Sequence, residues 1–321
     1  MTDGGRPAWT AQRECNRIMK NVMTTGTRAA GPAGTTHTWN GADGIRLAGR
    51  SWGDPDGTPV VLLHGSGQTR HAWSGIGRAL GAAGFHAVAF DARGHGESDW
   101  SPTGNYSQGA MIRDLERVAA MFEGRRPILV GAGLGGGTSL LAVGEGYLDA
   151  EALVLVNIAP YIEPAGVLRL QSFMRQPPDG FGSPDEAADA IRNYRSHPAH
   201  ALTQESLTRS LRYDDGKYRW HWDPHFLAWP RDLARRHTRF AASARRLKLP
   251  TLLVRGEESE IVSKAGAREF LDLCPHAEYA DVRDAGHTVA GEHNDLFAHT
   301  VLGFLERRMP RGPALRDRAV A

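Results

Sequence analysis

Short apolar runs alternate with segments of helical periodicity along most of this chain. Each run is mostly apolar and bounded by turn-forming residues, as is typical of strands buried on both faces of a sheet. Helical periods lie between several of the runs. This order predicts an α/β fold, with a mostly parallel central sheet flanked by helices. The runs cover residues 59–63, 84–91, 127–130, 153–157 and 250–255, and the helical periods lie at about 70–83, 107–123 and 134–146.

A hairpin is expected to precede the parallel strands. Residues 36–39 and 45–52 are predicted as its strands, with a Gly-Ala-Asp-Gly turn at 41–44. A short run at 277–282 and a helical period at about 291–308 close the pattern.

The alternation stops between about residues 159 and 235. This stretch has scattered helical segments, several prolines and many aromatic residues, and no strand is expected in it. It predicts an inserted helical lid, because long insertions beyond the carboxyl edge of an open sheet commonly cover a binding crevice. Four lid aromatics are candidates for substrate contact, with packing against the core as the alternative for each. They are Tyr161, Trp220, Trp222 and Phe226.

The remaining boundaries follow from the lid. The core is expected to comprise residues 36–158 and 236–309. Residues 1–35 are rich in Gly, Thr, Ala and Arg without a clear period, so we expect a disordered leader, with Met23 as a candidate start. Residues 310–321 are expected to be a flexible tail.

Composition and charge argue against several classes of function. A net charge of +2 over 321 residues gives no electrostatic case for nucleic acid or an acidic membrane surface. No apolar run approaches the roughly 20 residues of a membrane span, and no secretory signal is evident. The two cysteines, Cys15 and Cys274, argue against a disulfide framework or a zinc site, and Cys274 is expected to be buried. We expect a cytoplasmic protein that acts on a small molecule without a metal or cofactor, and its oligomeric state stays open.

Several segments that could carry chemistry follow strands, at the edge where open α/β sheets place their sites. His64-Gly65-Ser66-Gly67 follows the first parallel strand. Its glycines allow backbone N–H groups to face a small anionic atom, although an ordinary turn is the alternative. The segment from Asp91 to Ser98 follows the next strand and is rich in charge and glycine. We interpret it as a loop that braces the site.

The turn at residues 131–135 is the decisive segment. A strand, the pattern G-x-nucleophile-x-G and a helix together form a nucleophile elbow. The helix start supplies an amide N–H and the positive end of a dipole. Here the central residue is Gly133, which has no side chain.

Two later segments supply a base and acids. His287 ends the sequence Asp-Ala-Gly-His after the run at 277–282, and the acidic residues Glu257, Glu258 and Glu260 follow the preceding strand. A histidine on one loop with an acid on its neighbour is the arrangement of base and orienting group in a catalytic triad.

Taken together, these motifs resemble the α/β-hydrolase superfamily, in its lidded branch of esterases, epoxide hydrolases and cofactor-free haloperoxidases. The resemblance covers about residues 36–308 and rests on His64-Gly65, Asp91-x-Arg93-Gly94-x-Gly96-x-Ser98, the elbow and Gly286-His287.

The resemblance implies roles for particular residues. His287 corresponds to the base and Glu260 to the acid, in a segment like the family's Ser-Asp-x-x-Ser. The amides of Ser66 and Leu134 correspond to the oxyanion hole. The chain departs from the family at Gly133, and also at Asn157, where members often carry an aspartate in Val-Asp-x-x-Pro.

The expected function is hydrolysis of a small, apolar or aromatic ester, lactone or epoxide. His287 would activate a water held where the nucleophile is missing. One alternative is a lyase, isomerase or cyclase that uses the same pocket, and another is an inactive ligand-binding relative. A third is dinucleotide binding, because residues 131–136 also match G-x-G-x-x-G. Asn157 stands where that motif needs an acid.

Overall fold

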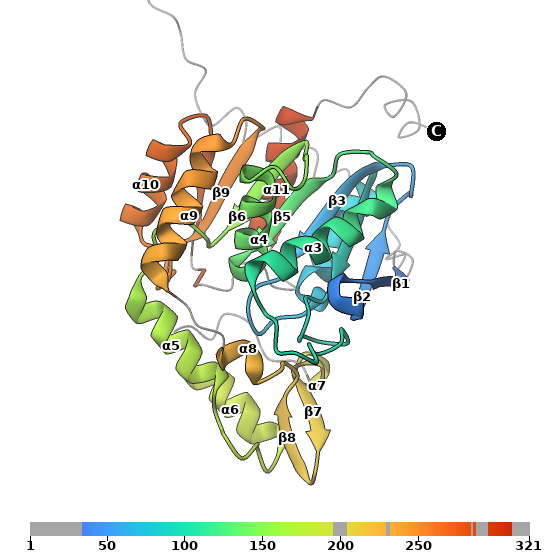
Figure 1. Ribbon diagram of the computed structural model, residues 1–321, viewed down its shortest axis with the longest axis vertical. Helices are drawn as coiled ribbons and strands as arrows, with labels where there is room; N and C mark the ends of the chain where they lie inside the picture. Colours follow the sequence, from blue (N-terminus) through green and yellow to red (C-terminus); the bar gives the residue numbers. More distant parts are fainter. Residues whose placement is uncertain (1–33, 195–203, 229–231, 284, 287–294, 310–321) are drawn as a thin grey trace, which may run out of the picture. The chain divides into compact units, whose positions relative to one another are not determined.

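The computed structural model describes residues 34–194, 204–228, 232–283, 285–286 and 295–309 (Figure 1). Its centre is an eight-stranded sheet in the order β1-β2-β4-β3-β5-β6-β9-β10. β2 pairs antiparallel with both β1 and β4, and the later pairings are parallel. The strands are β1 (Thr35–Asn40), β2 (Arg46–Trp52), β3 (Thr58–Leu63), β4 (Phe85–Phe90), β5 (Ile128–Ala132), β6 (Ala152–Val156), β9 (Thr251–Gly256) and β10 (Glu278–Val282).

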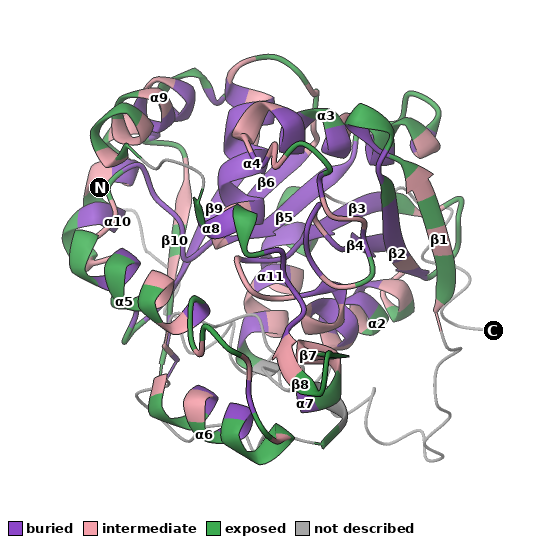
Figure 2. Cartoon of the chain, turned by 60° about the horizontal axis from the view of Figure 1, so that its bottom comes forward, coloured by how far each residue is buried: buried purple, intermediate pink, exposed green. Residues whose placement is uncertain are grey.

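Helices cover both faces of this sheet because successive residues of each strand point to opposite sides. Val61 and Leu63 join the hydrophobic cluster that contains helices α3, α4, α9 and α10. Val60 and Leu62 join the cluster of α2 and α11. Figure 2 shows the central strands buried and the outer helix faces exposed. The helices are α2 (Ser74–Ala82), α3 (Gln108–Ala119), α4 (Gly133–Gly144), α9 (Leu233–Arg246), α10 (Lys264–Leu273) and α11 (Asp295–Arg308).

The predicted α/β alternation and the N-terminal hairpin are confirmed. The helix expected from about residue 70 begins as a 3-10 turn, Arg70–Trp73, and becomes α-helical at Ser74. The helix expected from about residue 291 begins at Asp295, and residues 291–294 lie outside the described part. Most of the expected leader, and the whole expected tail, lie outside it as well.

The segment between β6 and α9 forms a separate group of elements, which we call the lid. Figure 1 shows it gathered at one end of the molecule, beyond the sheet. The helices are α5 (Pro164–Met174), α6 (Pro184–Tyr194), α7 (Gln204–Ser210) and α8 (His225–Ala228), and the strands β7 (Leu211–Asp214) and β8 (Lys217–Trp220) form an antiparallel pair.

This pair of strands corrects the expectation of a lid without strands. Asp215 and Gly216 both adopt positive φ, of 47° and 73°, between the two strands. Asp-Gly is a strong signal for a two-residue hairpin turn, because both central residues must adopt this conformation. The sequence therefore contained the signal that the aromatic and proline content obscured.

Lid side chains form their own hydrophobic cluster, which we call the lid cluster. It packs against the core through Tyr106 and Met111, and Leu134 at the start of α4 lies against it. Other buried members are Met174, Phe181, Trp220, Trp222 and Phe226. None of the helices among the described residues has the length and apolar character of a membrane span.

Candidate active site

The turn between β5 and α4 keeps the steric features of a nucleophile elbow. A Cβ on Gly131 would lie 2.5 Å from the Gly136 nitrogen, and one on Gly135 would lie 2.4 Å from the Leu63 Cβ. Side chains are therefore excluded at these two flanking positions. Gly133 has a φ of +45°, and among the described residues its Cβ would meet only the Gly65 Cα within 4 Å, at 3.8 Å. The glycine at 133 thus leaves open space at the tip of the turn.

The loop at residues 64–67 faces this tip. The Gly135 N–H donates to the His64 carbonyl over 3.1 Å, which joins the loop to α4. Ser66 and Leu134, the predicted oxyanion donors, are both partly exposed. Leu134 directly follows Gly133, and Ser66 directly follows Gly65. Leu134 stands in the first turn of α4, where backbone N–H groups have no acceptor within the helix and the dipole favours negative charge.

His64 fixes the loop by hydrogen bonds on both ring nitrogens. Its Nδ1 lies 2.8 Å from the Gly65 carbonyl, and its Nε2 accepts from the Ala92 N–H over 2.9 Å. Nδ1 therefore carries the proton. Burial lowers the pKa of His64, so the ring is neutral. This buried histidine connects two loops and is not a free base.

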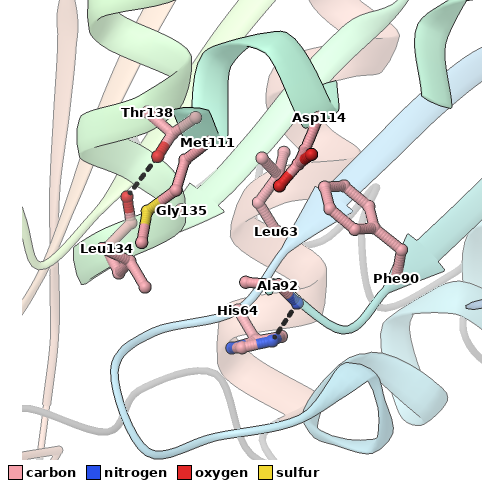
Figure 3. A pocket seen from close by; sticks show the side chains of 9 residues that line it. All are labelled: Leu63, His64, Phe90, Ala92, Met111, Asp114, Leu134, Gly135 and Thr138. Atoms are coloured by element: carbon pink, nitrogen blue, oxygen red, sulfur yellow. Dashed lines mark hydrogen bonds between the residues drawn. The ribbon is translucent and has the colours of Figure 1, made fainter. Parts of the chain in front are cut away.

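A small pocket lies beside the elbow (Figure 3). It has an empty volume of about 310 Å³, counting its open mouth. Figure 3 shows the hydrogen bond from Ala92 to His64 on one side, and Leu134 with Thr138 on another. Its lining is mostly apolar and comprises Leu63, His64, Phe90, Ala92, Met111, Asp114, Leu134, Gly135 and Thr138.

The loop at residues 91–98 braces the site, as predicted. The fully buried Asp91 carboxylate accepts from the Arg70 guanidinium and backbone N–H, and from the Glu97 N–H over 3.0 Å. The Ser98 hydroxyl donates to the Asp91 carbonyl over 2.6 Å and accepts from the Ala48 N–H over 3.0 Å.

Arg93 of the same loop is fully buried. Its guanidinium pairs in a bidentate way with Asp114, over 2.6 and 2.8 Å, and with Asp43 over 3.0 Å. Burial lowers the pKa of Arg93 while the two carboxylates raise it by more, so the net direction is upward.

His287, the predicted base, lies outside the described residues. The preceding residue, Gly286, is described, and its carbonyl accepts from the Asn157 side-chain amide over 3.2 Å. The Asn157 Oδ1 accepts from the Gly256 N–H over 2.8 Å. Asn157 has a φ of +48°, which asparagine tolerates better than most residues. Sequence reasoning treated it only as a missing acid, whereas its side chain joins the end of β9 to the loop that carries His287.

Glu260, the predicted acid, forms an ion pair with Arg169 of α5. Both side chains are 43% exposed. The backbone of Glu260 also packs on α5, since a Cβ on Gly166 would lie 2.2 Å from the Glu260 carbonyl oxygen. The acid loop therefore meets the first lid helix directly.

The four predicted substrate-contact aromatics occupy different places. Trp222 lies against the site loop, because a Cβ on Gly67 would be 3.3 Å from its ring. Trp220 stacks on Trp222 at 5.0 Å inside the lid cluster. Phe226 is buried against His95 and Tyr106. Tyr161 is 39% exposed, and its hydroxyl donates to Glu163.

Comparison with known proteins identifies the family of this fold and elbow. Residues 58–294 match the sequence model of the alpha/beta hydrolase fold family, which is more than half of the chain. The chain belongs to the α/β-hydrolase family. This membership decides against the dinucleotide-binding alternative, because the glycine-rich turn lies inside the matched region.

Several curated relatives of this hydrolase are enzymes. This chain is 28% identical to 2-hydroxy-6-oxo-6-(2'-aminophenyl)hexa-2,4-dienoic acid hydrolase from Metapseudomonas resinovorans, over 78% of its own length and 85% of the relative. It is 28% identical to an esterase from Mycobacterium tuberculosis, over 78% and 83%. It is 25% identical to a non-heme chloroperoxidase from Kitasatospora aureofaciens, over 83% and 98%.

Solved structures share the fold of the hydrolase. The crystal structure of E-2-(acetamidomethylene)succinate hydrolase matches with a TM-score of 0.71 at 22% identity, over 85% of this chain and 99% of that one. The crystal structure of an esterase from Mycobacterium tuberculosis matches with a TM-score of 0.66 at 24% identity, over 95% and 100%.

The cysteine and metal expectations concern other parts of the hydrolase. Cys274 is buried, as predicted, and burial raises the pKa of its thiol to about 11, so it is not a thiolate nucleophile at neutral pH. Cys15 lies outside the described residues. Across the described ranges, no group of three His, Cys, Asp or Glu side chains could hold a metal ion.

Four buried or half-buried histidines predict that the hydrolase loses stability in mild acid. Burial lowers the pKa of His71 and of His221 to about 4, and it also lowers the pKa values of His64 and His86. Unfolded histidine has a pKa of about 6.5, so the unfolded chain takes up protons first as the pH falls below that value. Stability is therefore complete above about pH 6.5 and declines toward about pH 4.

Each fully buried histidine can contribute a slope of up to about 1.4 kcal/mol per pH unit within this window, and a half-exposed one contributes less. Urea-unfolding midpoints at about pH 7 and pH 5 measure the effect, above the range where ordinary carboxyls titrate. Equal midpoints at the two pH values would show that folding does not lower the pKa values of these histidines.

Proposed function

We propose that this protein hydrolyses small esters, lactones or epoxides of apolar or aromatic character without forming a covalent bond between enzyme and substrate. The observation that carries the proposal is the elbow itself. Its flanking glycines keep the sharp turn, while the described residues leave the position of the nucleophile open opposite Gly65. A site built for attack on an electrophile thus has room for a water molecule in place of a serine hydroxyl.

In this proposal His287 acts as the general base. For an ester, the water oxygen forms a bond to the carbonyl carbon while the water proton passes to the imidazole. The amides of Ser66 and Leu134 donate to the resulting oxyanion. The tetrahedral intermediate then breaks its bond to the leaving oxygen, which takes the proton from the imidazolium. Glu260, in the loop that follows β9, orients His287.

The expected rates favour activated substrates. Triad enzymes stripped of their members retain roughly 10³–10⁴-fold acceleration from the oxyanion hole and binding alone. A positioned base adds about 10²–10⁴-fold. These factors are sufficient for a strained ring or a good leaving group, but they are small for an unactivated amide.

The lining of the site supports the substrate class. Trp222 and Met174 lie against Gly67, and Leu134 reaches from α4 into the lid cluster. Together with the mostly apolar lining of the pocket beside the elbow, these side chains surround the site with apolar groups. The names of the relatives, which include an esterase and a hydrolase of an aromatic oxo-dienoic acid, agree with a carbonyl substrate of this character.

The test is hydrolysis of p-nitrophenyl acetate, an aryl lactone and an aryl epoxide by the wild type and by His287→Ala. We expect wild-type turnover without a burst of product, and a loss of about 10²-fold or more in kcat for His287→Ala. His276→Ala is the matched control, because His276 is exposed and hydrogen-bonds only the Leu249 carbonyl and the Cys274 thiol among the described contacts. Absence of wild-type activity on all three substrates, or full activity in His287→Ala, would refute the proposal.

A further inference from the structure

Three consecutive lid residues hold both loops that surround the elbow. His221 accepts from the Gly96 N–H at Nδ1 over 2.8 Å, and its Nε2 lies 3.4 Å from the Gly67 carbonyl oxygen. The Trp222 ring packs against the backbone of Gly67, because a Cβ on Gly67 would lie 3.3 Å from it. The Asp223 N–H donates to the Gly94 carbonyl over 2.9 Å, and its carboxylate accepts from the Tyr106 hydroxyl.

His221 is the member of this group that touches both loops. A neutral imidazole has one donor and one acceptor. Because the Gly96 N–H requires an acceptor at Nδ1, the proton is on Nε2 and points to the Gly67 carbonyl. His221 is 6% exposed, and burial lowers its pKa to about 4, which agrees with the neutral form.

Several titratable groups lie around His221. After burial, the largest influence on its pKa is Asp91, which raises it, while His64 and His71 lower it; the centre of the His95 ring lies 6.0 Å from that of His221. Both ring nitrogens of His221 already have backbone partners. It therefore has no free nitrogen with which to act as a base toward substrate.

We propose that His221 is a positioning residue of the active site, which fixes the loop at residues 64–67 and links its position to the packing of the lid. This inference rests on the proposed function, because that loop carries Ser66, a proposed oxyanion donor. Gly67 has a φ of +73° and no side chain to hold it. The lid instead holds Gly67 from outside the loop, through the His221 ring, the Trp222 ring and the end of the Met174 side chain.

The expected effect on catalysis is large because oxyanion donors act over a narrow range. A donor must lie about 2.7–3.1 Å from the oxyanion, and a misplacement of about 1 Å can cost about 10²-fold in rate. Ground-state binding depends mainly on apolar contacts and is less sensitive. Loss of His221 therefore lowers kcat while KM changes little.

The experiment compares His221→Phe, which keeps a ring of similar size without polar atoms, with His221→Asn, whose side-chain oxygen can still accept from Gly96. We expect kcat for p-nitrophenyl acetate to fall about 10–100-fold in His221→Phe, with KM within about 3-fold, and to recover in part in His221→Asn. Tyr213→Ala is the lid control, because Tyr213 is 66% exposed on β7.

Hydrogen–deuterium exchange supplies a reading that does not depend on activity. Peptides covering residues 64–69 and 93–98 are expected to exchange faster in both His221 variants than in the wild type, and Tyr213→Ala is expected to match the wild type. Unchanged exchange in these peptides, or an unchanged kcat in a folded His221→Phe, would overturn the inference. If the wild type shows no hydrolysis at all, the proposed function fails, and the exchange data alone decide whether His221 holds the loop.

Discussion

Gly133→Ser is expected to give this hydrolase a covalent acyl-enzyme step that the wild type lacks. The new hydroxyl would stand at the tip of the elbow, where the proposed mechanism requires the base and the oxyanion amides to act. We expect a burst of p-nitrophenol equal to the enzyme concentration, and a rise in the acylation rate of about 10²-fold or more over the wild type.

The structure accommodates this substitution. Among the described residues, a Cβ at position 133 would meet only the Gly65 Cα, at 3.8 Å, so none of these residues has to move. The φ of +45° disfavours any residue with a Cβ, by about 1–2 kcal/mol. We therefore expect a folded protein that is less stable than the wild type by about this amount.

Gly133→Ala is the matched control for Gly133→Ser. It introduces the same Cβ and the same backbone strain without a nucleophile, so both variants should unfold at the same urea concentration while only the serine variant gives a burst. Stopped-flow absorbance measures the burst, and mass spectrometry detects the acetylated protein. A serine variant that is folded but neither bursts nor becomes acetylated would show that the base or the oxyanion amides are not aligned with the elbow.

Arg93→Met is expected to destabilise the hydrolase by about 3–5 kcal/mol, because it leaves a buried carboxylate without its cation. Asp114 is 2% exposed, and it receives two hydrogen bonds from the fully buried Arg93 guanidinium. Removing the guanidinium also leaves the Asn105 carbonyl without a 3.0 Å donor. Urea unfolding at neutral pH measures the loss.

Two further variants test the cause of this loss. Arg113→Met removes an arginine of α3 whose side chain is 51% exposed and lies 3.9 Å from Asp43, so it should change stability by less than about 0.5 kcal/mol. Adding Asp114→Asn to Arg93→Met removes the orphaned charge and should restore part of the stability. A loss below about 1 kcal/mol in Arg93→Met would show that water or another group replaces the guanidinium.

Local patterns in the sequence predicted the fold. Continuous apolar runs and helical periods depend on residues within a few positions of each other, so their order gave the α/β alternation that the structure has. The elbow was equally visible, because strand, glycine pattern and helix are contiguous. The lid hairpin was missed although Asp215-Gly216 signalled it, because its strands have only 4 residues each and stand among aromatic and proline residues.

The base and acid assignments, by contrast, still depend on the sequence. His287 lies outside the described residues, and the Glu260 carboxylate forms an ion pair with Arg169. Their roles rest on position after strands and on family resemblance. The kinetics of His287→Ala test the assignment of the base, and those of Gly133→Ser test whether the base and the oxyanion amides are aligned with the elbow.

By itself the sequence determined the sheet, the site edge and the absence of a side chain at the elbow, because each follows from local order along the chain. Only the tertiary structure showed that His221 joins Gly96 across 125 positions and that Asn157 joins Gly286 across 129. The physical reason is that a hydrogen bond between distant residues depends on how the intervening chain packs. Neither residue type nor spacing along the sequence contains that information.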